Sequence, residues 1–267
     1  MRETLIKVAE ENKTILCFGV DPDLLRIMVT VPAFPPQIAI EHFFENIIDK
    51  LIDENAVAAI KPNYAYFAQY GFDGLNALQT IMQTYRNKIP IILDVKRGDI
   101  GKTSEAYAKE AYDFWGADAV TISPYMGFDS VSPFLRDGKL AYMLCKTSNK
   151  GSEDFQELRC EGKAVLYEKV MEKALEWKCG AVIGATSDAI RKLARKTEGR
   201  VPFLIPGIGT QGGDLEMVLD AIKGSLPVHR INASSSIAYA FEKYNGTPAD
   251  AALKEAEGLN KKIRKYF

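Results

Sequence analysis

One short stretch, residues 91–103 (IILDVKRGDIGKT), places opposite charges at the end of an apolar strand. Asp94 and Lys96 are two residues apart, so a strand presents both side chains on the same face. Asp99 follows in the expected turn, and Thr103 lies one turn into the helix that follows. A lone Asp-x-Lys is most often a structural ion pair, because opposite charges beside apolar residues are costly to desolvate. The longer pattern is more specific and predicts a site.

The chemistry that this array suits is the stabilisation and protonation of a carbanion. Lys61, which ends another predicted strand, alternates in sign with Asp94, Lys96 and Asp99, so each charge has a partner. An ammonium held between carboxylates is favoured in its charged form, which makes it a poor nucleophile. The same ammonium is well suited to stabilise a carbanion and then to protonate it.

Alternating strand and helix patterns position these residues and predict an α/β fold, a (β/α)8 TIM barrel. An open doubly wound sheet is the alternative, but no Gly-x-Gly-x-x-Gly turn follows the first strand. We expect one domain over residues 1–267, with an N-terminal helix at about 3–12 and a C-terminal helix at about 248–266 packed on the barrel. The expected strands are 14–22, 57–62, 91–96, 117–124, 140–148, 180–186, 202–209 and 229–234.

Polar residues gather at the carboxyl ends of the expected strands, which surround the active site in barrels of this type. The opposite strand ends show no comparable cluster. The glycine-rich segment 207–213 runs into a helix, and together with the amides after the last strand it predicts a phosphate site. The polar strand ends are Asp21, Lys61, Asp94 with Lys96, 146–148, 206–213 and 232–235.

Composition argues against several other functions. The formal net charge is −1 and no basic block is present, so nucleic acid is not expected as a partner. No apolar run approaches the ~20 residues of a membrane span, and the first residues lack the apolar core of a signal peptide. The four cysteines show no Cys-x-x-Cys spacing, and His42 and His229 are not at ligand spacing. We therefore expect a reduced, cytoplasmic protein without a metal site.

Five motifs together resemble the orotidine 5′-phosphate decarboxylase family: Asp21, Lys61, the 94–103 signature, KTSN at 146–149 and PGIGTQGGD at 206–214. The resemblance implies a TIM barrel that removes CO₂ from orotidine 5′-monophosphate to give UMP, the last step of de novo pyrimidine synthesis, with no cofactor. It also implies that Lys96 protonates C6 of the pyrimidine, beside Asp94.

The same resemblance implies the roles of the remaining site residues. Lys61 and Asp21 would reach the ribose hydroxyls, and Asp99 and Thr103 would cross a homodimer interface into the partner's site. Ser148 would contact the pyrimidine ring. The expected catalytic residues are Lys96, Asp94, Lys61 and Asp99, and the expected substrate-binding residues are Asp21, Thr103, Ser148, Pro206, Gln211, Gly212, Ser234 and Ser235.

One position departs from the family pattern, and two other functions stay open. The family commonly has an arginine after the eighth strand that binds the phosphate, where this chain has Ser235. A Mg²⁺-dependent lyase similar to hexulose-phosphate synthase is one alternative, although Lys61 argues against it. A non-catalytic nucleotide-phosphate sensor is the other, although binding alone would not require so costly a charged array.

Overall fold

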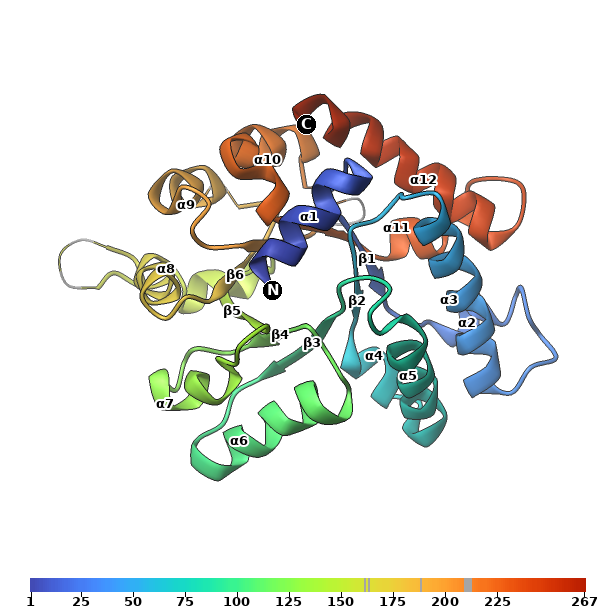
Figure 1. The fold of residues 1–267 in the computed structure, drawn as a ribbon, viewed down its shortest axis with the longest axis horizontal. Helices are drawn as coiled ribbons and strands as arrows, with labels where there is room; N and C mark the ends of the chain where they lie inside the picture. Colours follow the sequence, from blue (N-terminus) through green and yellow to red (C-terminus); the bar gives the residue numbers. More distant parts are fainter. Residues whose placement is uncertain (161, 163, 188, 209–212) are drawn as a thin grey trace.

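Eight parallel strands form a barrel in the computed structural model, which describes residues 1–160, 162, 164–187, 189–208 and 213–267. Neighbouring strands follow the order β2-β1-β8-β7-β6-β5-β4-β3, and the bridges Ile60–Ile91 and Asn63–Asp94 close the ring between β2 and β3. The predicted (β/α)8 barrel is therefore confirmed (Figure 1). The strands are β1 Leu16–Val20, β2 Ala59–Pro62, β3 Ile92–Arg97, β4 Ala119–Ile122, β5 Leu140–Lys146, β6 Gly180–Ile183, β7 Phe203–Pro206 and β8 Arg230–Ala233.

Helices surround the barrel and bury their apolar faces against it (Figure 1). In the described part of the chain, no helix is both long and apolar enough to cross a membrane. The helices are α1 Arg2–Asn12, α2 Leu24–Ile27, α3 Pro36–Asp53, α4 Tyr64–Ala68, α5 Gly71–Tyr85, α6 Gly101–Lys109, α7 Phe128–Val131, α8 Leu166–Glu176, α9 Ala189–Thr197, α10 Leu215–Ile222, α11 Ser235–Ala238 and α12 Pro248–Ile263.

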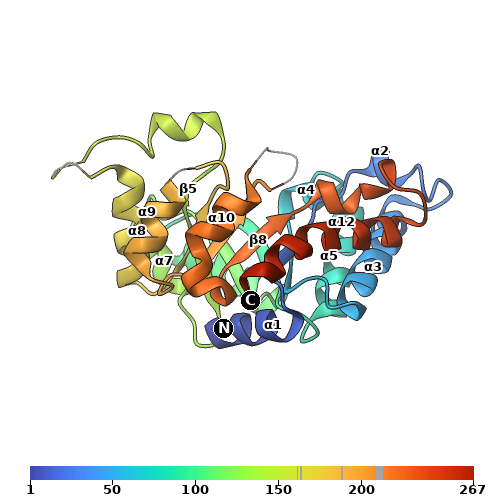
Figure 2. The same ribbon diagram turned by 90° about the horizontal axis from the view of Figure 1, so that it is seen from above.

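The first helix closes one end of the barrel. Leu5 of α1 is fully buried among inward-facing residues such as Cys17, Ile92 and Tyr142, which come from three different strands. Arg230 at the start of β8 donates a hydrogen bond to the backbone oxygen of Leu5. Figure 2 shows α1 at one end of the barrel, with the chain that follows β5 extending from the other end. The carboxyl ends of the strands therefore open away from α1.

Three helical segments differ from the expectations of the sequence. The helix α4, Tyr64–Ala68, follows β2 and was not predicted, because five residues are too few to show helical periodicity. The helix expected after residues 91–103 is α6, which begins at Gly101 and continues as a π-helical turn, Glu110–Phe114, that the sequence pattern did not predict. The segment after β8 forms the single turn of α11 and a 3₁₀ turn, Ala240–Glu242, both of which are too short to show a helical period.

Candidate active site

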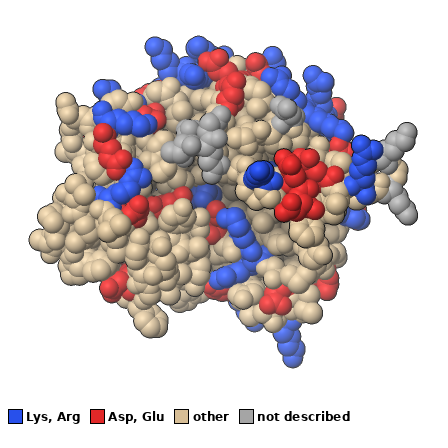
Figure 3. All heavy atoms as spheres, turned by 180° about the vertical axis from the view of Figure 1, so that it is seen from behind, with Lys and Arg blue, Asp and Glu red and all other residues tan. Residues whose placement is uncertain are grey.

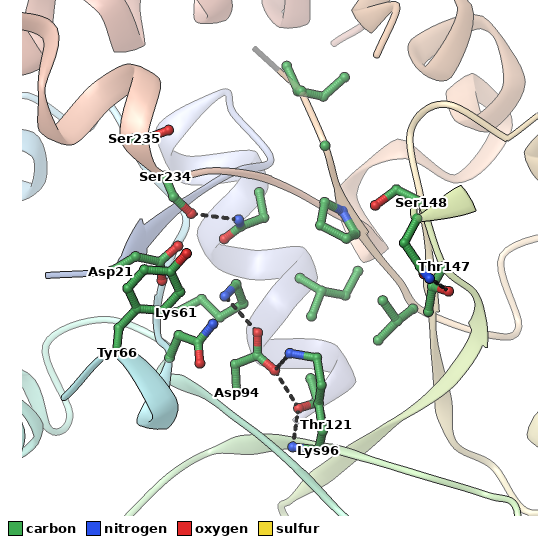
Figure 4. A pocket seen from close by; sticks show the side chains of 18 of the residues that line it. Asp21, Lys61, Tyr66, Asp94, Lys96, Thr121, Thr147, Ser148, Ser234 and Ser235 are labelled. Atoms are coloured by element: carbon green, nitrogen blue, oxygen red, sulfur yellow. Dashed lines mark hydrogen bonds and ion pairs between the residues drawn. The ribbon is translucent and has the colours of Figure 1, made fainter. Parts of the chain in front are cut away.

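A cavity of about 600 Å³ opens among the carboxyl ends of the strands. The described lining comes from all eight strands and the segments that follow them, including Thr121 inside β4 and Val182 inside β6. Figure 3 views the molecule from the side opposite to α1, where basic and acidic side chains meet near the centre of the face. Figure 4 shows the labelled side chains around this space, on different strands and on the segments that follow them. Of the predicted polar strand ends, the described residues that line the cavity include Asp21, Lys61, Asp94, Lys96, Thr147, Ser148, Ser234 and Ser235.

A charged array lies on the β2–β4 side of the cavity and is centred on Asp94. Its Oδ2 accepts a hydrogen bond from Lys61 Nζ at 2.9 Å, and its Oδ1 accepts one from Lys96 Nζ at 2.6 Å. Thr121 Oγ1 donates to the same Oδ1 at 2.7 Å. Figure 4 shows the two ammonium groups on either side of the carboxylate. The i and i+2 spacing on β3 and the neighbouring strand end on β2 thus bring these three charges together.

Burial and charge act against each other in this array. Burial disfavours the charged form of Asp94, but the ammonium groups of Lys61 and Lys96 outweigh it and hold the pKa of Asp94 well below its usual range. Burial likewise opposes the charge of Lys61, but Asp94 and Asp21 outweigh it and raise the pKa of Lys61. The Lys61 and Asp94 side chains are only 5% and 10% exposed, so each depends on the other for its charge.

Lys96 differs from Lys61 in both exposure and backbone conformation. Its side chain is 50% exposed and reaches into the cavity from the end of β3. Its φ angle is 45°, a left-handed conformation that residues other than glycine adopt rarely and at a cost of roughly 1–3 kcal/mol. The Lys96 backbone N–H donates to Thr121 Oγ1 at 3.0 Å, which helps to hold this conformation. The strain coincides with the irregular register between β3 and β4.

Sequence reasoning missed Thr121, which connects both the backbone of Lys96 and the carboxylate of Asp94. Thr121 is 1% exposed and lies inside β4. The strand pattern could have indicated Thr121. Ala119 faces the barrel interior, and Thr121, two positions later on the same strand, points to the same face. A polar residue at such a position requires a buried hydrogen-bond partner.

The opposite side of the cavity carries hydroxyl and amide groups. Asn232 Nδ2 donates to Ser234 Oγ at 3.1 Å. A β-carbon on Gly19 of β1 would overlap Ser234 Oγ, so glycine is required for this close approach. Asp21 Oδ1 and Asn232 Oδ1 are buried without a hydrogen-bond partner among the described residues. Buried oxygens of this kind are suited to accept hydrogen bonds from the hydroxyl groups of a ligand.

The other predicted residues fall into three groups. Ser148, Pro206, Ser234 and Ser235 line the cavity, as expected for substrate-binding residues. Asp99 and Thr103 are not part of its described lining, so the alternating array ends at Lys96 within one chain. Asp99 Oδ1 instead accepts a hydrogen bond from the backbone N–H of Ile100 at 2.8 Å, and Thr103 is exposed. Gln211 and Gly212 lie outside the described residues.

Two charged side chains near the strand ends do not contribute to this cavity. Lys146, at the end of β5, turns away to donate to Ser152 Oγ at 2.6 Å and to pair with Glu157 at 3.0 Å. Arg230 is fully buried at the start of β8, at the end of the barrel covered by α1. Arg230 therefore cannot replace an arginine at position 235.

Among the described residues, no three His, Cys, Asp or Glu side chains gather in a metal-binding arrangement.

The fold and the charged cavity define a TIM-barrel enzyme, and comparison with known proteins identifies its family. Residues 14–225 match the model of the "Orotidine 5'-phosphate decarboxylase / HUMPS family". The chain belongs to this family and is a carboxy-lyase.

Individual relatives cover nearly the whole chain. The orotidine 5′-phosphate decarboxylase of Herpetosiphon aurantiacus is 41% identical over an alignment of 257 residues, and the alignment covers 94% of this chain and 93% of that protein. The enzyme of the same name from a Janthinobacterium species is 41% identical and covers 99% of this chain and 98% of its own.

Solved structures agree with this assignment. The Leishmania donovani OMP decarboxylase has a TM-score of 0.80 and 35% identity, with 98% of both chains covered. The UMP synthase of the same organism has a TM-score of 0.81 and 38% identity. This chain is covered to 98% in that comparison but spans only 56% of the UMP synthase.

Proposed function

We propose that this protein decarboxylates orotidine 5′-monophosphate to UMP by stabilising and then protonating a carbanion at C6 of the pyrimidine. The observation that carries the proposal is the contact of Lys96 and Asp94 at the cavity, in a chain of the decarboxylase family. Lys96 is the exposed end of the array, and Asp94 and Lys61 are buried behind it. A proton donor has to reach the substrate, and Lys96 meets this requirement.

The bond changes follow from the charges. The bond between C6 and the carboxylate breaks, CO₂ leaves, and the electron pair remains on C6. The Lys96 ammonium stabilises this charge and transfers a proton from Nζ to C6, and water later returns a proton to Nζ. Asp94 holds Lys96 at 2.6 Å and places its own negative charge beside the substrate carboxylate, a repulsion that the loss of CO₂ relieves.

The ribose is assigned to the part of the cavity between Lys61 and Asp21. Asp21 Oδ1 has no hydrogen-bond partner among the described residues, and Lys61 Nζ has a proton to offer beyond the one that it donates to Asp94. Ser148 and Pro206 would contact the pyrimidine ring from β5 and β7. Gln211 would bridge the base and the phosphate, and Gly212 would belong to the same substrate-binding segment, as the family resemblance implies. The cytoplasm is the proposed compartment, in keeping with four free cysteines.

A homodimer would give Asp99 and Thr103 a role that they lack within one chain. Both lie just beyond β3, and Thr103 is exposed on α6. The neighbouring Ile100 and Tyr125 are 57% and 82% exposed, which is unusual for large apolar side chains. A partner subunit packed on these loops would cover them and bring its Asp99 towards Lys96 of this chain. The charged array would then regain its fourth member.

Subunit mixing tests this arrangement. Lys96→Ala and Asp99→Ala should each inactivate the homodimer, because every site then lacks one catalytic residue. A mixed dimer contains one intact site, so mixing should restore up to about half of the wild-type activity per mixed dimer. The measurement is turnover after subunit exchange, with exchange confirmed by mass spectrometry of differently tagged chains. Absence of recovery would show that each site is built within one chain.

The proposed reaction is tested by following the absorbance of orotidine 5′-monophosphate during incubation with the protein. We expect complete conversion to UMP, with the same rate after treatment with EDTA. A rate abolished by EDTA and restored by Mg²⁺ would favour the metal-dependent lyase. No turnover, with equal affinity for UMP and for a carbanion-mimicking inhibitor, would favour the sensor.

A further inference from the structure

The proposed substrate carries a phosphate dianion, and the cavity has one cation that the charged array does not use. The described lining contains three cationic side chains: Lys61, Lys96 and Arg26. Both lysines pair with Asp94. Position 235 is a serine and is the first residue of α11, which has only four residues, so the dipole of this helix supplies little positive charge. Arg26 is therefore the remaining cationic side chain of the described lining.

Arg26 is held at the same side of the cavity as Ser234 and Ser235. Its guanidinium carbon lies 3.7 Å from the ring centroid of Tyr239. Tyr239 also lines the cavity, and its backbone N–H donates to the backbone oxygen of Ser235 at 3.1 Å. In the strand order, β1 and β8 are neighbours, whereas β4 with Thr121 lies across the barrel. Arg26 therefore lies on the β1 and β8 side of the cavity, whereas Lys96 and Thr121 lie on β3 and β4. The phosphate and the pyrimidine are likewise at different ends of the nucleotide.

The orientation of Arg26 leaves hydrogen-bond donors available. Nε and Nη2 both donate to the Glu242 carboxylate at 2.7 Å, which fixes one edge of the guanidinium. Within the described part of the chain, Nη1 makes no hydrogen bond. The second edge, formed by Nη1 and Nη2, can still bind two oxygens of a phosphate. Stacking on Tyr239 and pairing with Glu242 restrict the side chain, so little conformational freedom is lost on binding.

We propose that Arg26, oriented by Tyr239 and Glu242, binds the 5′-phosphate of the nucleotide and supplies the positive charge that position 235 lacks. This proposal rests on the proposed function. Three carboxylates oppose it: Glu242 partly neutralises Arg26, and Asp21 and Asp23 also line the cavity. Asp23 Oδ1 is engaged with the backbone N–H of Leu25. Removal of the Glu242 charge should therefore strengthen phosphate binding, whereas removal of Arg26 should weaken it.

The test compares the affinities of UMP and uridine, measured by calorimetry, because the two ligands differ only in the phosphate. Arg26→Gln should weaken UMP binding by about tenfold to a hundredfold, the range for a lost hydrogen bond to a charged group. Its affinity for uridine should stay within about twofold. Glu242→Gln should bind UMP as tightly as the wild type or more tightly. Arg264→Gln is the matched control, because Arg264 makes the same two-pronged pair with Glu257 outside the cavity lining.

Different results separate the possible failures. If Arg26→Gln leaves UMP affinity unchanged, or weakens UMP and uridine equally, Arg26 does not bind the phosphate and the proposal is wrong. If Glu242→Gln weakens UMP binding as much as Arg26→Gln does, the Arg26–Glu242 pair only stabilises the local structure, and the proposal is likewise wrong. Failure of the proposed function is seen separately, as the absence of orotidine 5′-monophosphate turnover by the wild-type protein.

Discussion

Lys96→Ala is expected to abolish decarboxylation, lowering the catalytic rate by at least about 10⁴-fold. General acid catalysis contributes about 10²–10⁴-fold, and loss of one charge that stabilises the transition state adds a comparable factor. Lys61 cannot replace Lys96, because its ammonium is buried and bound to the other oxygen of Asp94. Turnover should be measured from the absorbance of orotidine 5′-monophosphate at saturating substrate.

The barrel should stay folded in this variant. The Lys96 side chain is half exposed, and alanine would adopt the same left-handed backbone that lysine already has. We expect the free energy of unfolding to change by less than about 1 kcal/mol, as measured by urea denaturation. Lys102→Ala is the matched control, since Lys102 is an exposed lysine on α6 that does not line the cavity. Turnover like that of the wild type in Lys96→Ala would refute the assigned role of Lys96.

The barrel could be predicted because buried parallel strands have a simple sequence pattern. Both faces of such strands are covered, so each strand appears as a continuous apolar run followed by a polar residue. Leu16–Val20 and Ala119–Ile122 are examples in which every residue is buried. Short helices have no comparable signal. The helix α4 has five residues and α11 has four, so their formation depends on tertiary contacts and capping, such as the Asn63 side chain that accepts from the Ala65 N–H.

The two sides of the cavity were predictable to different extents. Asp94 and Lys96 could be placed together because a strand fixes the relation between positions i and i+2. Arg26 could not be placed, because its position depends on stacking against Tyr239, which is far along the chain. The same holds for Asp99, whose proposed partner belongs to another subunit. Spacing within one element predicts geometry, whereas contacts between distant elements have no local signal.

Asp94→Asn should cause the largest loss of stability among the site variants, about 3–5 kcal/mol at neutral pH. The substitution keeps the shape of the side chain but leaves the Lys61 ammonium buried without its main counter-charge. Asp21 lies near enough to affect Lys61 but makes no hydrogen bond to it. The measurement is the free energy of unfolding in urea, compared with Lys96→Ala, which removes only the exposed partner of Asp94. Equal stability of the two variants would contradict the assigned dependence of Lys61 on Asp94.

The pH dependence of stability should also change in Asp94→Asn. In the wild type, the pKa of Asp94 is lowered and that of Lys61 is raised, so the pair stabilises the fold between about pH 4 and pH 10, the ordinary values of the two groups. This contribution is lost below about pH 4, as Asp94 gains a proton. Without Asp94, burial becomes the dominant influence and lowers the pKa of Lys61, so the unfolded chain binds more protons than the folded one. The free energy of unfolding of Asp94→Asn should therefore rise from pH 7 to pH 10. That of the wild type should not rise over this range. Urea denaturation at several pH values tests this, and parallel pH profiles for the two proteins would show that Lys61 and Asp94 are not coupled.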